Sequence, residues 1–190
     1  MNTKSENNLI KGVKEVLITG DKMQKRVEEL GKKISEDFAD KDLVVIGVLK
    51  GSIIFFADLI RKITLPITLD FISVSSYGGS TSSTGVVTVR KDISCDITGK
   101  DVLIVEDIID TGLTLKYLKD MFVARNAESV SICSALDKPS RRDKDIDIKV
   151  EYIGFQIPDE FVVGYGLDYS GKYRNLPDIC VLSAEVYGKN

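Results

Sequence analysis

Residues 102–114 read VLIVEDIIDTGLT, and this stretch decides the fold class. Its first four residues are apolar and β-branched or leucine, which is typical of a strand buried on both faces of a parallel sheet. Two adjacent acids follow at Glu106 and Asp107, and Asp110 opens a turn that contains Gly112. The stretch therefore predicts a buried strand that ends in carboxylates, then a turn, then a helix.

The same alternation of strand and helix extends along the chain. Short apolar runs predict strands at 43–49, 69–75, 85–93, 129–136, 150–157 and 179–184. Helical spacing predicts helices at 21–39, with Asp21 as the cap, at 53–63, and from the turn to Arg125. We expect one α/β domain with a central, mostly parallel, twisted sheet flanked by helices. The charged run at 141–149 is interpreted as a solvated loop.

Ligands in such sheets bind beyond the carboxyl ends of the strands. This places Lys50 and Gly51, the stretch 106–114 and the segment after residue 136 near one another. A loop at 75–85, in which every residue except Tyr77 is Gly, Ser or Thr, lies at the same edge. It is either a long hairpin connection or a mobile lid.

Composition excludes several classes of function. The 190 residues are 43% hydrophobic and 29% charged, which fits a soluble globular domain. The net charge of −3 disfavours non-specific nucleic-acid binding. The chain has no histidine, so Ser-His-Asp, Cys-His and HExxH chemistry are excluded. Proton transfer must use other side chains, and a metal held by oxygen ligands points to magnesium.

The chain carries no sign of a membrane span or of secretion. No apolar run approaches the roughly 18 residues that a spanning helix needs, and the polar N-terminus does not resemble a signal peptide. We therefore expect a cytoplasmic protein. The three cysteines show no CxxC spacing, which argues against a disulfide framework or a zinc site.

The turn at 110–114 is suited to bind a phosphate. Backbone N–H groups and a helix N-terminus point at the anion, Thr111 and Thr114 add hydroxyls, and Gly112 permits close approach. The chain contains neither a Walker A loop nor a GxGxxG fingerprint. A lone phosphate beside a polyol and a cation fits best. For any single acid, a helix cap or an ordinary strand-end residue remains the simpler interpretation.

The segment VEDIIDTGLT resembles the motif of type I phosphoribosyltransferases that binds phosphoribosyl pyrophosphate (PRPP). Residues 49–52 resemble the family's pyrophosphate loop, 76–78 the start of its lid, and 161–169 the base-binding and second metal segment of the hypoxanthine-guanine branch. An acid at the position of Asp110 is typical of that branch, whereas the adenine and orotate branches typically carry Ala or Thr there. This position therefore distinguishes the branches. Leu113 departs from relatives that have Lys at this point.

The resemblance implies magnesium-dependent transfer of the 5-phosphoribosyl group from PRPP to hypoxanthine, and to guanine, in purine salvage. It implies that Asp110 is the catalytic acid/base group near purine N7. It also implies that ribose and the 5′-phosphate are bound by Glu106, Asp107, Ile109, Asp110, Thr111, Gly112, Leu113 and Thr114. Magnesium would be held by Glu106, Asp107 and Asp168.

Further roles follow from the same resemblance. Lys50 and Gly51, with a cis peptide bond before Lys50, would meet pyrophosphate together with Arg174. The purine would be bound by Lys138 at O6, by Phe161 through stacking, by the Val162 backbone and beside Asp168. Ser76 and Tyr77 would begin the lid.

The family's architecture implies a core at about 20–157 and a small hood from 1–19 and 158–190. It also implies a homodimer or homotetramer, with no nucleic-acid or membrane partner. Two alternatives remain: a nucleotide-sensing, RNA-binding regulator on the same fold, and a catalytically silent module that binds a magnesium nucleotide. The sequence does not rank hypoxanthine, guanine and xanthine.

Overall fold

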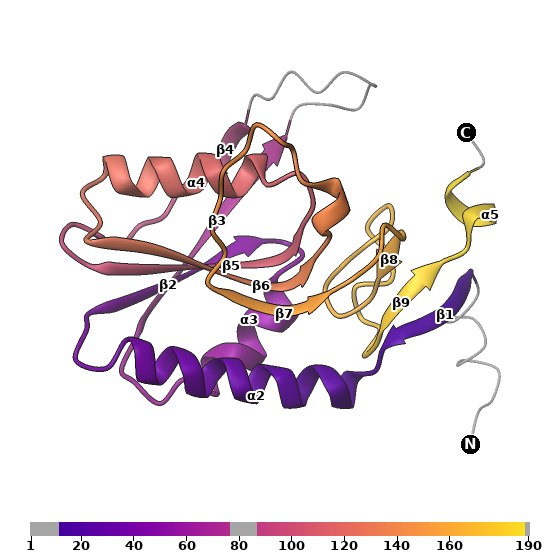
Figure 1. Cartoon of the computed structure of the whole chain (residues 1–190), viewed down its shortest axis with the longest axis horizontal. Coiled ribbons are helices and arrows are strands. Elements are labelled where there is room, and N and C mark those ends of the chain that lie inside the picture. The colour runs from indigo at the N-terminus through magenta and orange to yellow at the C-terminus, as the bar shows by residue number, and fades with distance from the viewer. Residues whose placement is uncertain (1–11, 77–86, 189–190) are drawn as a thin grey trace.

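Strand β5 (Asp101–Ile109) contains the apolar run and lies inside a six-stranded sheet. The structure is a computed structural model that describes residues 12–76 and 87–188. The other strands of this sheet are β2 (Leu43–Leu49), β3 (Thr68–Ser76), β4 (Val87–Lys91), β6 (Ser129–Asp137) and β7 (Tyr152–Gln156). The order is β4-β3-β2-β5-β6-β7, and every pair is parallel except β3 with β4 (Figure 1). The expected mostly parallel α/β fold is confirmed.

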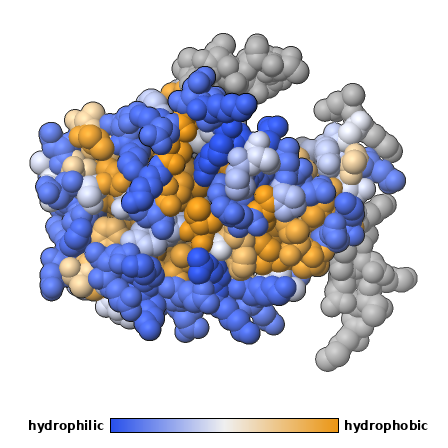
Figure 2. Space-filling model, in the orientation of Figure 1, coloured by the Kyte–Doolittle hydropathy of each residue, from blue (hydrophilic) through white to orange (hydrophobic). Residues whose placement is uncertain are grey.

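Helices cover both faces of this sheet. Helices α2 (Gly20–Asp37) and α3 (Ile53–Ile60) lie on one face and α4 (Leu113–Ala124) on the other (Figure 1). Alternate strand residues point to opposite faces, so Val45 packs with α2 and α3 whereas Ile46 packs with α4. This explains why β2 and residues 102–105 of β5 are apolar on both faces of the sheet. Hydrophilic side chains cover the outward face of α2, along the lower edge of the molecule (Figure 2).

Helix α2 is capped by Thr19, so the expected cap at Asp21 was wrong. Thr19 has an extended backbone with ψ of 151°, and its hydroxyl accepts a hydrogen bond from the Lys22 N–H at 3.4 Å. Asp21 instead lies within the first turn, where a negative charge favours the helix dipole. Among the described residues, no helix is long and apolar enough to cross a membrane.

A second sheet joins the two ends of the described chain. It has the order β1-β9-β8, with β1 (Val13–Ile18), β8 (Val162–Val163) and β9 (Ile179–Leu182) all antiparallel. We call it the hood sheet, and it lies beyond one end of the central sheet (Figure 1). Strand β1 was not expected, and the strand expected at 179–184 ends at Leu182 before α5 (Ala184–Tyr187).

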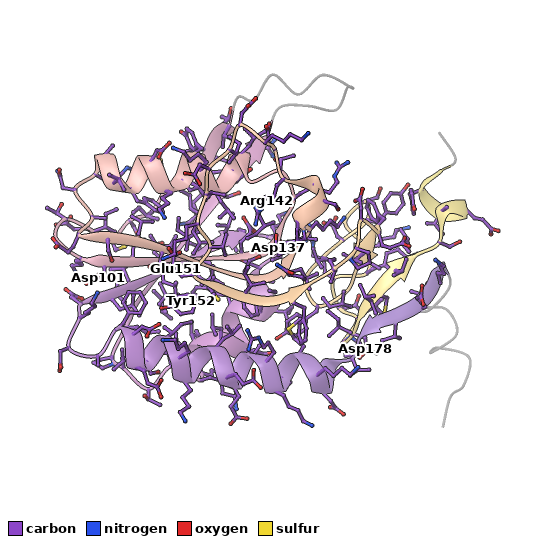
Figure 3. All side chains as sticks on the ribbon, in the orientation of Figure 1. Asp101, Asp137, Arg142, Glu151, Tyr152 and Asp178 are labelled. Atoms are coloured by element: carbon purple, nitrogen blue, oxygen red, sulfur yellow. The ribbon has the colours of Figure 1, made fainter. Side chains whose placement is uncertain are left out.

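The connection at 141–149 is not simply solvated, which corrects the sequence interpretation. It follows a short 3-10 helix, η1 (Pro139–Arg141). The Arg142 guanidinium donates to Asp137 at 2.8 Å, and the two side chains point toward each other (Figure 3). Ile148 packs against the core on the α4 side of the sheet. The isoleucines that alternate with acids in this run therefore face inward.

A close approach at Gly31 yields a prediction about stability. A Cβ at Gly31 would overlap the Lys62 side chain and lie 2.8 Å from the Lys62 carbonyl oxygen. In an isolated helix, Gly→Ala stabilises by about 1 kcal/mol. Here Gly31→Ala should instead lower the free energy of unfolding by roughly 1–3 kcal/mol, because α2 and the chain after α3 must separate. Urea unfolding measures this.

The control is Lys32→Ala, at an exposed position of the same helix. It should change the free energy of unfolding by no more than about 0.5 kcal/mol. A more stable Gly31→Ala protein would contradict the close packing.

Candidate functional site

Two carboxylates lie side by side where β5 approaches its end. β5 is longer than expected, so Glu106 and Asp107 belong to the strand, and Glu106 pairs in register with Ser134. Glu106 is 8% exposed and Asp107 is half-buried. The Asp107 N–H donates to Glu106 at 3.1 Å. Burial, followed by repulsion from Asp107, raises the pKa of Glu106 well above its usual range.

Burial also raises the pKa of Asp107, against several opposing influences. The Ile108 N–H donates to its carboxylate at 2.7 Å, and the positive charge of Arg174 favours its charged form. In the described part of the chain, no three Asp, Glu, His or Cys side chains surround one point as a closed metal cage would require. Mg²⁺ commonly takes only one or two carboxylates and fills its other positions with water and substrate oxygens. The acid pair fits that ion.

The turn after β5 forms the wall of a hollow. Gly112 has a φ of +88° and occupies the N-cap position of α4, where no side chain caps the helix. The hollow has a volume of about 150 Å³. Its lining consists of residues 106–112 with Thr114 and Leu115. The expected ribose-phosphate residues thus surround one cavity, with Leu113 outside the lining.

A segment that sequence reasoning missed supports this turn from behind. A Cβ at Gly112 would lie 3.3 Å from Arg142 Nη1 and 3.4 Å from both Ile146 and Ile148. The Asp143 N–H donates to the Thr111 carbonyl at 3.1 Å. Arg142 Nη1 is buried with no hydrogen-bond partner in the described part of the chain. In the sequence, the isoleucines that alternate with acids in this run were the signal that the segment packs inward.

Asp110 is paired with a cation that the sequence did not reveal. Arg141 Nε donates to the Asp110 carboxylate at 2.9 Å, and both side chains are about half exposed. Arg141 also lies 3.8 Å from Asp159, and Lys138 Nζ lies 3.7 Å from the same acid. The Lys138 N–H donates to the Ile109 carbonyl at 2.9 Å. The expected acid/base and base-binding residues are therefore neighbours.

The Lys50–Gly51 turn touches the acid pair. It lies between β2 and α3, and the peptide bond between Leu49 and Lys50 is cis, as expected. A Cβ at Gly51 would overlap the Asp107 carboxylate. Only glycine fits at this position, because any larger residue would displace either the turn or the acid. The expected pyrophosphate turn and one of the expected ribose-binding acids are thus in direct contact.

The hood also reaches the Lys50–Gly51 turn. A Cβ at Gly166 would overlap the Gly51 carbonyl oxygen. Arg174 pairs with Asp168 at 2.6 Å. These contacts bring the expected second metal segment and the expected pyrophosphate arginine to the same edge of the sheet as Asp107.

The expected base-stacking residue lies in an aromatic group of the hood. Phe161 stacks on Tyr187 with ring centroids 5.0 Å apart and meets the edge of Tyr169 at 5.7 Å. It remains 37% exposed, whereas the adjacent Val162 is buried. Of the expected lid, Ser76 ends β3, and Tyr77 lies outside the described residues.

The raised pKa of Glu106 predicts that this acid destabilises the folded chain near neutral pH. The folded state binds a proton at Glu106 more tightly than the unfolded state, so this penalty is absent at low pH and grows as pH rises above the unfolded value of about 4.5. Glu106→Gln should raise the free energy of unfolding by roughly 1–3 kcal/mol at pH 8. The gain should shrink at pH 5.

Urea unfolding at both pH values, without divalent cations, measures this difference. Glu128→Gln, at an exposed acid, is the control and should leave the pH dependence of stability unchanged. An equal gain from Glu106→Gln at pH 5 and pH 8 would contradict the burial of a charged group.

The comparisons with known proteins agree with the geometry. A sequence model of the phosphoribosyl transferase domain matches residues 15–170. The hypoxanthine-guanine phosphoribosyltransferase of Staphylococcus epidermidis is 51% identical over 179 residues, which cover 94% of this chain and 99% of that protein.

Two solved structures extend the comparison. A hypoxanthine phosphoribosyltransferase from Staphylococcus aureus is similar with a TM-score of 0.90 at 48% identity, over 98% of each chain. The hypoxanthine phosphoribosyl transferase of Trypanosoma cruzi has a TM-score of 0.86 at 41% identity, over 93% of this chain and 94% of that one. The resemblance inferred from residues 105–114 is confirmed, and the chain belongs to the phosphoribosyl transferase family.

Proposed function

We propose that the chain is a magnesium-dependent hypoxanthine-guanine phosphoribosyltransferase of purine salvage. It joins the 5-phosphoribosyl group of PRPP to N9 of hypoxanthine or guanine and releases pyrophosphate. The observation that carries this proposal is the contact of Gly51 with Asp107, since it sets the pyrophosphate turn against the acid pair, which lines one hollow together with the turn at 110–114. Relatives that match nearly end to end carry the same name.

The phosphate turn binds the 5′-phosphate of PRPP. Gly112 gives α4 no side-chain cap, and the Leu113 N–H makes only a long hydrogen bond to the Thr111 hydroxyl at 3.4 Å, so the N–H groups at this helix N-terminus can turn to an anion. The Thr111 and Thr114 hydroxyls add donors beside them. Glu106 and Asp107 line the same hollow, where they would bind the ribose hydroxyls and would hold Mg²⁺.

Carboxylates of this chain would hold magnesium. Glu106 and Asp107 would provide ligands for one ion and Asp168 for a second. When bound, Mg²⁺ neutralises negative charge on the departing pyrophosphate. Arg174 pairs with Asp168 at 2.6 Å, so its guanidinium lies where it can bind the same pyrophosphate group.

Asp110 accepts the proton that the purine must lose. The C1′–N9 bond forms as the bond from C1′ to the pyrophosphate oxygen breaks, and the base then carries a surplus proton at N7. With no histidine in the chain, a carboxylate at the rim of the hollow is the suitable acceptor. The ion pair with Arg141 is half exposed and therefore weak enough to yield to substrate.

Three residues select the base. The Lys138 side chain is only 12% exposed, so its ammonium has little freedom and donates to an oxo group at C6 while repelling an amino group. The exposed part of the Phe161 ring stacks on the purine, since Tyr187 and Tyr169 hold the ring in place. The Val162 backbone reads the purine edge. Ser76 and Tyr77 begin a lid that excludes water.

The hood, the assembly and the compartment complete the proposal. We assign the hood to 1–19 and 158–190 and the core to 20–157. Among the described residues, the contact of Gly166 with Gly51 supports a hood that closes one side of the site. We expect a homodimer or homotetramer, as the family resemblance implies. Three free cysteines fit the cytoplasm.

The regulatory alternative finds no support. Relatives at about half identity over more than nine-tenths of the chain are named as enzymes. Both carboxylates and the phosphate turn line one hollow, which also disfavours a silent module.

A panel of bases tests the activity. The purified protein with Mg²⁺ and PRPP should release pyrophosphate with hypoxanthine and guanine, but not with adenine, orotate or uracil.

Lys138→Gln should lower kcat/KM for hypoxanthine by about 10-fold, as expected for a lost hydrogen bond from a charged donor. The same variant should also reduce the ratio of kcat/KM for hypoxanthine to kcat/KM for adenine. An unchanged ranking of bases would remove Lys138 from the base site, and silence with every base would overturn the activity.

Asp110→Asn tests the proton acceptor. It should lower kcat with hypoxanthine by roughly 10²–10⁴-fold, because the amide cannot accept the proton. The dissociation constant for PRPP should change only a few-fold. Asp120→Asn, at an exposed acid of α4, is the control and should leave both values unchanged. Equal losses in turnover and PRPP binding would assign Asp110 to binding alone.

A further inference from the structure

Tyr165 fastens the hood to the core at a point outside the proposed substrate contacts. Its hydroxyl donates to the Asp58 carboxylate of α3 at 2.6 Å. The Gln24 side-chain amide of α2 donates to the same carboxylate oxygen and lies 3.5 Å from the Tyr165 hydroxyl. Tyr165 is only 5% exposed. These three residues, which we call the anchor, join three segments that are far apart in the sequence.

The backbone at Tyr165 is strained, so we expect its side chain to make a stabilising interaction that compensates. Its φ is +50°, in the left-handed region that a bulky residue rarely adopts. Gly164 and Gly166 on either side have φ of +95° and +103°. Burial, and then the bond to Asp58, raise the pKa of the Tyr165 hydroxyl, so that it remains a donor. The part-buried hydrogen bond to Asp58 offsets the strain.

The residue after Tyr165 is hydrogen-bonded directly to Arg174, so the position of Tyr165 affects the position of Arg174. The Gly166 N–H donates to the Arg174 carbonyl at 2.9 Å, and Arg174 Nη1 donates back to the Gly166 carbonyl at 2.7 Å. Arg174 Nη2 holds Asp168 at 2.6 Å. A shift of the chain at Tyr165 therefore moves both side chains that we assign to pyrophosphate and its metal.

The other end of the anchor lies on the helix that begins at the pyrophosphate turn. The Ile53 N–H at the start of α3 donates to the Lys50 carbonyl at 3.2 Å. Asp58 follows on the second turn of α3. Gly166 also packs on the Gly51 carbonyl. The hood loop thus contacts the pyrophosphate turn through its backbone at Gly166, and α3 through the side chains of the anchor.

We propose that Tyr165 and Asp58 are positioning residues that hold Arg174 and Asp168 at the separation from the Lys50–Gly51 turn that a pyrophosphate group requires. This rests on the proposed function. Neither residue touches the reacting atoms. Loosening the anchor should therefore weaken the grip on the pyrophosphate end of PRPP and leave the purine site unchanged.

The test compares Tyr165→Phe with Tyr152→Phe. Tyr152 is similarly buried, and its hydroxyl also donates to a carboxylate, Asp37, at 2.8 Å, but it joins β7 to α2 away from the hollow. Both variants lose one such bond and should lose similar stability. Tyr165→Phe alone should raise the dissociation constant for magnesium pyrophosphate, measured by calorimetry, by about 10-fold.

The same variant should raise KM for PRPP by a similar factor, with KM for hypoxanthine within about twofold of the wild-type value. Asp58→Ala should match it, Asp58→Asn should restore part of the affinity, and the double variant with Tyr165→Phe should be no worse than either single change. Equal effects of Tyr165→Phe and Tyr152→Phe, or equal rises in KM for both substrates, would overturn the positioning role.

The outcomes separate this inference from the proposed function. An active wild-type protein with unchanged pyrophosphate affinity in Tyr165→Phe would refute the anchor alone. A wild-type protein that binds pyrophosphate but turns over no base would refute the proposed function. The calorimetric comparison of the two tyrosine variants would then still decide the anchor.

Discussion

The contact between Gly51 and the Asp107 carboxylate is the constraint on which the site depends. A side chain at residue 51 would occupy the space of that carboxylate, and the Gly51 carbonyl in turn leaves no room for a side chain at Gly166. One turn is therefore enclosed by β5 on one side and by the hood on the other. The start of α3, the end of β5 and the hood loop can meet only because two of the three contacting residues are glycines.

The acid pair shows how the fold sets stability against function. The middle of β5 is buried on both faces, which fixes the strand firmly in the sheet. The same strand carries Glu106 into an environment that raises its pKa well above the usual range. A sequence selected for stability alone would place an apolar residue there. Such a local conflict between charge and burial is typical of a functional site.

The sequence was informative where structure follows from local pattern. Strand β2 begins and ends as expected, because seven consecutive apolar residues leave no alternative to a central strand. Strand β1 was missed, because exposed Lys14 and Glu15 mask its pairing with β9. The cations near Asp110 and Gly112 were missed for a related reason. Arg141 pairs with Asp110 across α4 and β6, and Arg142 pairs with Asp137 at the end of β6, but a charged run in a sequence does not show which acids it pairs with.

The phosphate turn illustrates how backbone geometry can replace side-chain charge. Residues 110–114 contain an acid but no cation, and Leu113 stands where some relatives carry Lys. The nearest cation behind Gly112 is Arg142, whose charge is largely balanced by buried Asp137 at 2.8 Å. Its guanidinium and the adjacent isoleucines therefore support the left-handed conformation of Gly112 more than they attract an anion. That conformation leaves α4 without a side-chain cap at Gly112, so the phosphate affinity that we propose would rest on the helix N-terminus itself.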